Sequence, residues 1–103
     1  MRDVNPNLEV IVISTPIPNR DAVRSDEGDM DGHNMAGECE KYVEQLEAYA
    51  RDRNYAAFAD MTNLSKYVLE KKDWWDITAN NINHPNDFLI RMEAQLICSL
   101  ICR

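Results

Sequence analysis

Apolar and polar residues follow two different periods along the chain, and these periods predict two strands and three helices. The run 8–14, LEVIVIS, is rich in β-branched residues and holds a single charge, which is typical of a strand buried on both faces of a parallel sheet. Pro16 and Pro18 end this strand, because proline donates no hydrogen bond to a sheet. A shorter apolar run, 55–60, predicts a second buried strand.

Helical spacing marks three further segments. The first covers 38–53, where one apolar stripe contains Cys39, Tyr42, Val43, Leu46, Tyr49 and Ala50. Asn63 is the expected N-cap of a helix over 63–72, and the lysines at its end suit the negative pole of the helix dipole. Pro85 and Asp87 favour a helix start, so the last helix is expected over 86–102. The stretch between these two helices, with Trp74 and Trp75, has no period and is expected to be irregular.

Strands that alternate with helices indicate one α/β unit over 1–103 with a parallel sheet. Segment 19–37 is acidic and has no period, and a loop of that length is usually functional or disordered. Two strands make a marginal sheet, and the last helix carries apolar residues on nearly every side of Ser99. The pattern therefore predicts a core that needs further cover.

Length and charge restrict the class of function. A chain of 103 residues with 45% hydrophobic residues fits one domain, but a doubly wound α/β domain usually needs about 150 residues or more. With 18 acidic and 11 basic side chains the net charge is -7, which argues against nucleic acid or anionic membrane as the main partner. No apolar run is long enough to cross a membrane, and no signal-peptide core follows Met1. The sequence does not indicate a cellular compartment.

Cysteine and histidine are few. Cys39, Cys98 and Cys102 form an odd set without a C-x-x-C pair, so neither a disulfide framework nor a zinc ribbon is expected. Buried free thiols are the favoured interpretation of Cys98 and Cys102. His33 lies in the acidic segment and is expected to be solvated. We expect no metal site and no cofactor.

His84 stands immediately before Pro85 and the last helix. The positive end of a helix dipole disfavours the imidazolium form, which suits a histidine that accepts protons as a general base. The position suits equally a residue that only caps the helix and turns the chain. Spacing alone leaves both interpretations open.

The segment 80–87, NNINHPND, resembles the last conserved block of the SGNH hydrolases, also called GDSL esterases and lipases. Asn5-Pro6 before the first strand, Thr15-Pro16 after it, and Asp60-Met61-Thr62 after the second are similar to the later strands of that fold. The resemblance covers almost the whole chain, although only the histidine block is specific. It implies the C-terminal portion of a three-layer α/β/α, flavodoxin-like sandwich with parallel strands.

The resemblance also implies hydrolysis of an acyl ester by a serine nucleophile, a histidine base and an acidic partner. His84 matches the base. Asn81 occupies the acid's place three residues earlier, and an amide orients an imidazole without adding charge. Asp76 is therefore a candidate acid. None of Ser14, Ser25, Ser65 and Ser99 stands in a Gly-Asp-Ser turn, and no Gly-x-Asn-Asp segment follows, so the chain is expected to be inactive alone.

Two alternatives come from other classes of function. The chain could act by association, either with a complementing half or as a homodimer through exposed apolar faces. The acidic segment also places Glu27, Asp29, Asp31, Gly32 and Glu38 at the first, third, fifth, sixth and twelfth positions of an EF-hand-like calcium loop. Against calcium, the first position is Glu rather than Asp, and no entering helix is expected before it.

Overall fold

A computed structural model describes the backbone of residues 2–21 and 32–102, and the side chains of 2–21 and 37–102. It is a mixed α/β structure, as the sequence predicts, and its elements are β1 (Val10–Ile13), α1 (Gly32–Arg51), β2 (Ala56–Ala59), α2 (Met61–Leu69), α3 (Trp74–Ile77) and α4 (Asp87–Ile101). The two strands pair in parallel, with Val10 beside Ala56 and Ile13 beside Ala59. The parallel pairing requires the long crossover that contains α1.

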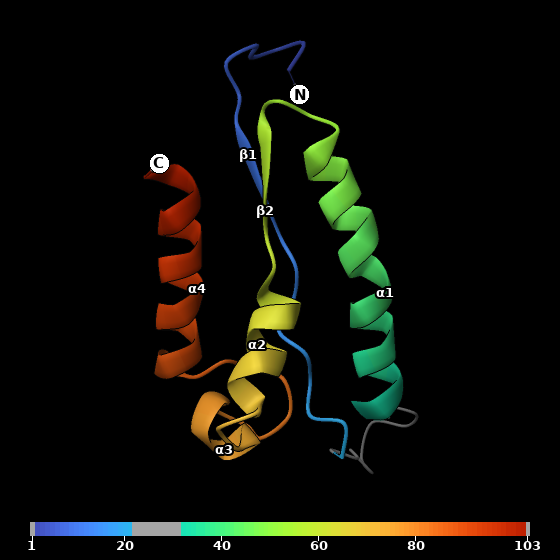
Figure 1. Ribbon diagram of the computed structural model, residues 1–103, viewed down its shortest axis with the longest axis vertical. Coiled ribbons are helices and arrows are strands. Elements are labelled where there is room, and N and C mark those ends of the chain that lie inside the picture. The colour runs from blue at the N-terminus through green and yellow to red at the C-terminus, as the bar shows by residue number, and fades with distance from the viewer. Residues whose placement is uncertain (1, 22–31, 103) are drawn as a thin grey trace.

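The strand pair lies between two long helices. Figure 1 shows α1 on one side of the strands and α4 on the other. Both strands run toward the end of the molecule where α2, α3 and the loop before α4 gather. The carboxyl ends of both strands therefore face this loop.

The best-packed part of the core lies beside that loop. It is formed by Met61, Val68, Ile77 and Leu89, from α2, α3 and α4, with partly buried Leu64, Leu69, Trp74, Met92 and Leu96 around them. The strands are less well covered, and Ile13 remains 40% exposed. The expected burial of the 8–14 strand on both faces is not met here: Val10–Val12 are half-buried and Ile13 is exposed, because one helix on each side covers the strand pair only in part (Figure 1).

Several element boundaries differ from the sequence prediction. Helix α1 begins at Gly32, earlier than the expected residue 38, because 32–37, GHNMAG, contains two glycines and shows no apolar period from which a helix would be predicted. The N-cap of α2 is Asp60, whose carboxylate accepts the Asn63 N–H at 2.9 Å, so the prediction that Asn63 is the cap is wrong. Segment 74–77 is helical rather than irregular, and the Asp76 carboxylate accepts the Asp73 N–H at 3.0 Å, as in a capping box.

A buried hydrogen-bond network ties the segment after β1 to α2. Ser14 Oγ accepts the Thr62 N–H at 3.0 Å, and Thr62 Oγ1 donates to the Thr15 carbonyl at 2.6 Å. Ser65 Oγ accepts the Ile17 N–H at 2.9 Å and donates to the Thr62 carbonyl at 2.8 Å. These side chains form hydrogen bonds with backbone groups that lie beyond the end of β1 and therefore have no partner in the sheet.

Replacing Ser65 by alanine is expected to lower the free energy of unfolding by about 1–3 kcal/mol, because the buried Ile17 N–H loses its acceptor. Urea unfolding followed by circular dichroism measures the change. The matched control is Ser99→Ala, whose exposed hydroxyl donates only to the Leu96 carbonyl; there we expect less than about 0.5 kcal/mol. Equal effects of the two substitutions would contradict the assigned role of Ser65.

A surface ion cluster joins α1 to two other segments. Glu40 Oε1 lies 2.7 Å from Arg20 Nη2 and 3.0 Å from Lys66 Nζ. The hydrogen bond from Lys66, aided by the charges of Lys66 and Arg20, lowers the pKa of the Glu40 carboxyl. The groups are partly exposed, so solvent screens much of this interaction.

The lowered pKa of Glu40 predicts a pH-dependent contribution to stability. A carboxyl whose pKa falls on folding stabilises the native state above its unfolded pKa, here near 4.5, and this contribution is lost as the pH falls through the folded value. Glu40→Gln is expected to lower the free energy of unfolding by less than about 1 kcal/mol at neutral pH. Once Glu40 is protonated in the wild type, we expect the variant and the wild type to be equally stable. Chemical unfolding at neutral pH and at about pH 3 checks this, with the exposed Glu44→Gln as the matched variant. If the difference in free energy of unfolding between wild type and Glu40→Gln grows as the pH is lowered, the prediction is wrong.

Candidate active site

The loop that carries His84 is a closed turn between α3 and α4. Thr78 and Pro85 form an antiparallel bridge, the Ala79 N–H donates to the His84 carbonyl at 2.8 Å, and the Asn86 N–H donates to the Ile77 carbonyl at 3.0 Å. Asn86 also caps α4, because its side chain accepts the N–H groups of Phe88 and Leu89. These contacts set His84 beside the first turn of α4, as the sequence predicts.

The side chain of Asn80 organises the inside of this turn. Its Oδ1 accepts the backbone N–H groups of Ile82, Asn83 and His84, each at 3.0 Å. One side-chain oxygen thus accepts hydrogen bonds that backbone carbonyl groups would otherwise accept. Asn81 takes a left-handed conformation with φ of 56°, which asparagine tolerates better than most residues. The backbone on either side of His84 is therefore fixed.

Two amides also hold the imidazole of His84. Its Nδ1 lies 2.8 Å from Asn83 Oδ1 and 2.7 Å from Asn80 Nδ2. When Nδ1 carries the hydrogen, it donates to Asn83 Oδ1 and leaves the Nε2 lone pair free to accept a proton. The imidazolium keeps the same bond to Asn83. In the other tautomer Nδ1 accepts from Asn80. The ring is exposed, so a reacting group can approach it from outside.

Asn81 and Asp76 have other partners in this structure. The Asn81 carbonyl accepts a bond from Asn19, and Asn81 Oδ1 is buried without a partner among the described residues. Asp76 Oδ2 accepts the Asp73 N–H at the start of α3. No hydrogen bond to His84 is found for either side chain within the described chain. Their roles beside His84 stay predictions, and the two amides that contact the ring, Asn80 and Asn83, were missed although they belong to the same asparagine-rich run.

Asn19 connects the histidine loop to the segment that follows β1. It is 5% exposed, its N–H donates to the Ile82 carbonyl at 2.7 Å, and its Nδ2 donates to the Asn81 carbonyl at 2.9 Å. Its own Oδ1 accepts the Asp21 N–H. The loop is thereby fixed to the carboxyl end of β1. The sequence analysis missed Asn19, whose one signal is its place directly after Pro16-Ile17-Pro18.

Replacing Asn80 by alanine is expected to loosen the histidine loop, because three backbone N–H groups lose their acceptor. Loss of about 1–3 kcal/mol of local stability speeds amide hydrogen exchange at Ile82, Asn83 and His84 by about tenfold or more. Asn83→Ala is the matched control, since its Oδ1 contacts only the His84 ring and the Asn80 amide. If both variants exchange like wild type at these amides, Asn80 does not organise the turn.

The described serines are engaged elsewhere. Ser14 and Ser65 are buried in the network between β1 and α2, and the Ser99 hydroxyl donates to the Leu96 carbonyl. Ser25 lies outside the described residues. Asp60, at the carboxyl end of β2, caps α2 and lies 3.4 Å from Ser14 Oγ. None of the three described hydroxyls is hydrogen-bonded to His84.

Metal ligands and thiols add no second catalytic site. Within the ranges the structure describes, no group of three His, Cys, Asp or Glu side chains could hold a metal. Of the calcium-loop positions, Glu27, Asp29 and Asp31 lie outside these ranges, and Gly32 begins α1 instead of forming the sharp turn that a sixth position needs. Cys98 and Cys102 are exposed free thiols rather than buried ones, because the outer side of α4 is uncovered. None of the described helices has the length and apolarity that a membrane crossing requires.

Comparisons with known proteins give no neighbour: no family model matches the sequence, and neither the curated proteins nor the solved structures contain a significant match. The functional argument therefore depends on the geometry of the site. That geometry is an exposed imidazole whose Nδ1 lies within hydrogen-bonding distance of the Asn83 and Asn80 amides, one for each tautomer, at the carboxyl end of a pair of parallel strands. An imidazole fixed in this way can take a proton at Nε2 and return it.

Proposed function

We propose that this chain is the C-terminal part of an ester hydrolase of the SGNH (GDSL) type, and that His84 is its general base. The observation that carries the proposal is that His84 Nδ1 lies 2.8 Å from Asn83 Oδ1; in the tautomer with the hydrogen on Nδ1, this contact leaves the Nε2 lone pair free. A serine supplied by the rest of the domain gives its proton to Nε2 as it attacks the acyl carbon of the ester. His84 then returns the proton to the leaving alcohol.

The position of the loop supports the same proposal. Ligands of α/β proteins bind outside the carboxyl ends of parallel strands, and Asn19 fixes the histidine loop at that end of β1. The proposed complete fold is a three-layer sandwich. In it α1 and α4 supply one helix to each outer layer, since they lie on opposite sides of the strands (Figure 1).

The third member of the proposed triad is the residue that orients the imidazole of His84. Asn80 and Asn83 orient the imidazole but add no negative charge to stabilise the imidazolium. Asp76 Oδ2 accepts the Asp73 N–H, and no hydrogen bond joins the Asp76 side chain to His84 within the described residues. Asn81 stands in the family's acid position, and its Oδ1 is buried without a partner among the described residues, so its proposed role in positioning the ring requires the side chain to turn toward His84. In the proposed site, amide side chains rather than a carboxylate orient the imidazole.

An esterase assay on the purified chain tests the assignment of the nucleophile to a segment outside it. Wild type and His84→Ala are compared on p-nitrophenyl butyrate. We expect the two rates to be equal and no higher than the rate with an unrelated protein, because none of the described serines is bonded to His84. Turnover that disappears in His84→Ala would show that the chain holds its own nucleophile, and the proposal of a C-terminal part would fail.

A further inference from the structure

Two of the three cysteines of the chain lie one helical turn apart at the end of α4. Cys98 lies in the last turn of the helix, and Cys102 is its C-cap, whose N–H donates to the Cys98 carbonyl at 2.9 Å. An α-helix makes this bond between residues four positions apart, so the helical spacing continues as far as Cys102. Both thiols are free and exposed.

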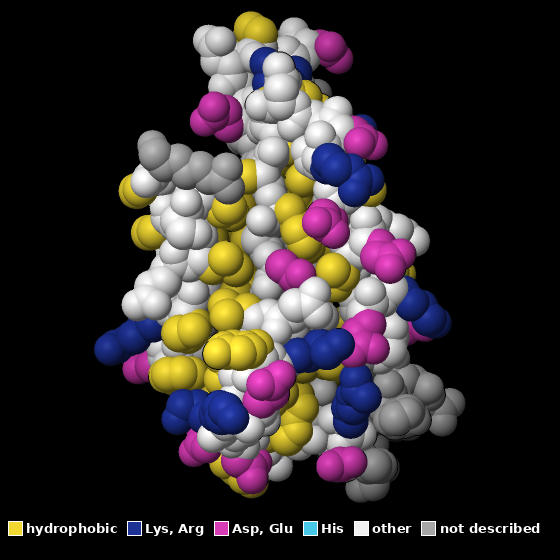
Figure 2. Space-filling model, viewed as in Figure 1, with side chains coloured by type: hydrophobic (Ala, Val, Ile, Leu, Met, Phe, Trp, Pro, Cys, Tyr) yellow, Lys and Arg dark blue, Asp and Glu magenta, His cyan; other side chains and the backbone are white. Residues whose placement is uncertain are grey.

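The last two turns of α4 carry no charged side chain. The charged residues of the helix, Asp87, Arg91 and Glu93, all lie in its first half, and residues 94–102 contain none. Figure 2 shows charged side chains over the lower part of α4, where the helix begins, and hydrophobic and other side chains above them. The Ser99 hydroxyl already donates to the Leu96 carbonyl. At this end of the helix the two sulfur atoms are therefore the side-chain atoms best suited to a soft metal ion.

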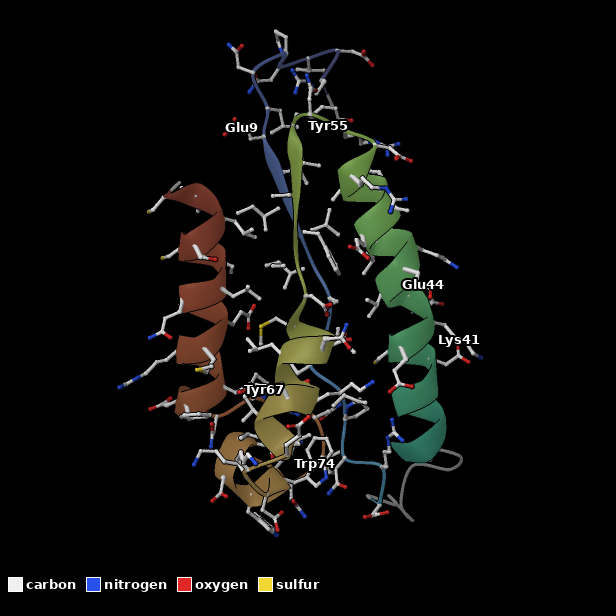
Figure 3. The ribbon with its side chains drawn as sticks, viewed as in Figure 1. Glu9, Lys41, Glu44, Tyr55, Tyr67 and Trp74 are labelled. Carbon is white, nitrogen blue, oxygen red and sulfur yellow. The ribbon has the colours of Figure 1, made fainter. Side chains whose placement is uncertain are left out.

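The two thiols share the outer side of α4. Residues four positions apart lie on one side of a helix, with Cβ atoms about 5–6 Å apart. Arg91 and Ala94, seven and four positions before Cys98, lie on the same side and are exposed as well. The residues of α4 that pack into the core follow the opposite side: Leu89, Met92 and Leu96. In Figure 3, side chains of α4 extend both toward the strand pair and away from it. The thiols belong to the outward set, so strands added to the sheet would not cover them.

A pair of thiolates is a ligand set for soft metal ions. Thiolate ligands select Cu(I), zinc and iron–sulfur clusters. Structural zinc and iron–sulfur clusters are usually held by four ligands, and no group of three His, Cys, Asp or Glu side chains that could hold a metal occurs among the described residues. Cu(I) has a filled d shell and forms linear complexes with two thiolates. The number of ligands therefore favours Cu(I) over zinc.

The helical spacing also fits a linear site. Two metal–sulfur bonds of about 2.3 Å each, the length of a zinc–thiolate bond, separate the sulfur atoms by about 4.6 Å when the bonds lie in line. Each sulfur atom is bonded to its Cβ atom, and the two Cβ atoms are about 5–6 Å apart. Rotation about χ1 between staggered positions brings the sulfur atoms to the required separation. The backbone of α4 does not have to change.

We propose that Cys98 and Cys102 bind one Cu(I) ion between them on the outer side of α4. Both thiols release their protons to solvent, each thiolate sulfur donates a lone pair to the ion, and the ion keeps its oxidation state. The expectation of no metal site went with buried thiols, whereas both thiols are exposed.

The proposed copper site lies far from the histidine loop. Helix α4 has 15 residues, so its end is about 22 Å from its start, where the loop of His84 joins it. The copper proposal is therefore independent of the ester hydrolase assignment.

Anaerobic titration of the reduced chain with Cu(I), against the chelator bathocuproine disulfonate, tests the proposal. We expect one Cu(I) per chain, a mass in sedimentation that stays at 11.9 kDa, and two sulfur ligands in the X-ray absorption spectrum of copper. If the chain binds Cu(I) no more tightly than the variant with both Cys98→Ser and Cys102→Ser, the proposal is wrong. Copper that is held between two chains, or that is bonded to three sulfur atoms, overturns it as well.

Single variants identify the ligands. Cys98→Ser and Cys102→Ser are each expected to lower the affinity for Cu(I) by more than the about 10–100-fold that loss of an outer-shell partner costs. Cys39→Ser, which removes the half-buried thiol of α1, is the matched control and should leave the affinity unchanged. If Cys39→Ser lowers the affinity as much as Cys102→Ser does, the ion is not held by the α4 pair.

Moving one thiol along α4 tests the spacing. Ala94→Cys, added to Cys102→Ser, places an exposed thiol four positions before Cys98 on the same side of the helix and is expected to restore the affinity. Ile90→Cys, added in the same way, keeps the number of thiols but places the new one, at a residue that is 49% exposed, about 12 Å along the helix from Cys98. We expect no restoration there. Equal affinities of the two double variants would show that the spacing plays no part.

Discussion

Replacing His84 by alanine is expected to lower kcat of the proposed complete ester hydrolase by about 10²–10⁴-fold, the usual contribution of a positioned general acid or base. The physical reason is the geometry of the ring. With the hydrogen on Nδ1, the ring donates to Asn83 Oδ1 at 2.8 Å, and the free Nε2 is the atom proposed to take the proton of the nucleophile. Alanine leaves the nucleophile protonated. Hydrolysis of a p-nitrophenyl ester by the chain joined to its nucleophile-bearing segment measures the loss.

The matched control uses the second histidine. His33→Ala removes the other histidine of the chain, to which the proposal gives no part in the proton transfer, and we expect kcat within about twofold of wild type. Circular dichroism establishes that both variants fold. If His33→Ala and His84→Ala lower kcat equally, or if His84→Ala keeps full activity, then His84 is not the base.

Replacing Ile77 by alanine is expected to lower the free energy of unfolding by about 2–5 kcal/mol, a large share of the about 5–15 kcal/mol that holds a typical domain folded. Ile77 has 0% exposure and packs in the cluster with Met61, Val68 and Leu89, where three helices meet. The truncation removes buried apolar surface and leaves a cavity that the neighbours fill only in part. The midpoint of urea unfolding measures the change.

Val4→Ala is the control for this core substitution. It also truncates a β-branched apolar side chain, but Val4 is 91% exposed, so removal of its methyl groups buries or exposes almost nothing new. We expect a change of less than about 0.5 kcal/mol. Similar midpoints for the two variants would mean that the cluster around Ile77 does not hold the fold together.

The sequence predicted the main elements because their patterns are local. The apolar run that contains β1, the stripe of α1 and the start of α4 at Asn86-Asp87 follow from residue type and period. Helix α3 was missed because four residues are too few to show a helical period. The shift of the α2 cap from Asn63 to Asp60 arose because both residue types favour caps, and only the backbone decides between them.

The candidate site was predictable only in part. His84 was proposed from its place before Pro85, and in the structure its loop is bonded to the segment that follows β1. The contacts that fix it were not found, because Asn19 reaches Asn81 across 62 positions of sequence and no local pattern reports such a bond. The two amides at the imidazole depend on a turn conformation, including the left-handed Asn81, that residue type permits but does not dictate.

We propose that this chain carries the histidine of an ester hydrolase whose nucleophile is encoded before it. Sequencing the coding DNA upstream of Met1 is the decisive experiment. We expect an in-frame segment in which a β-branched strand leads into Gly-Asp-Ser and a later strand into Gly-x-Asn-Asp. An in-frame upstream segment that lacks a Gly-Asp-Ser turn, or a stop codon directly before Met1, would contradict it.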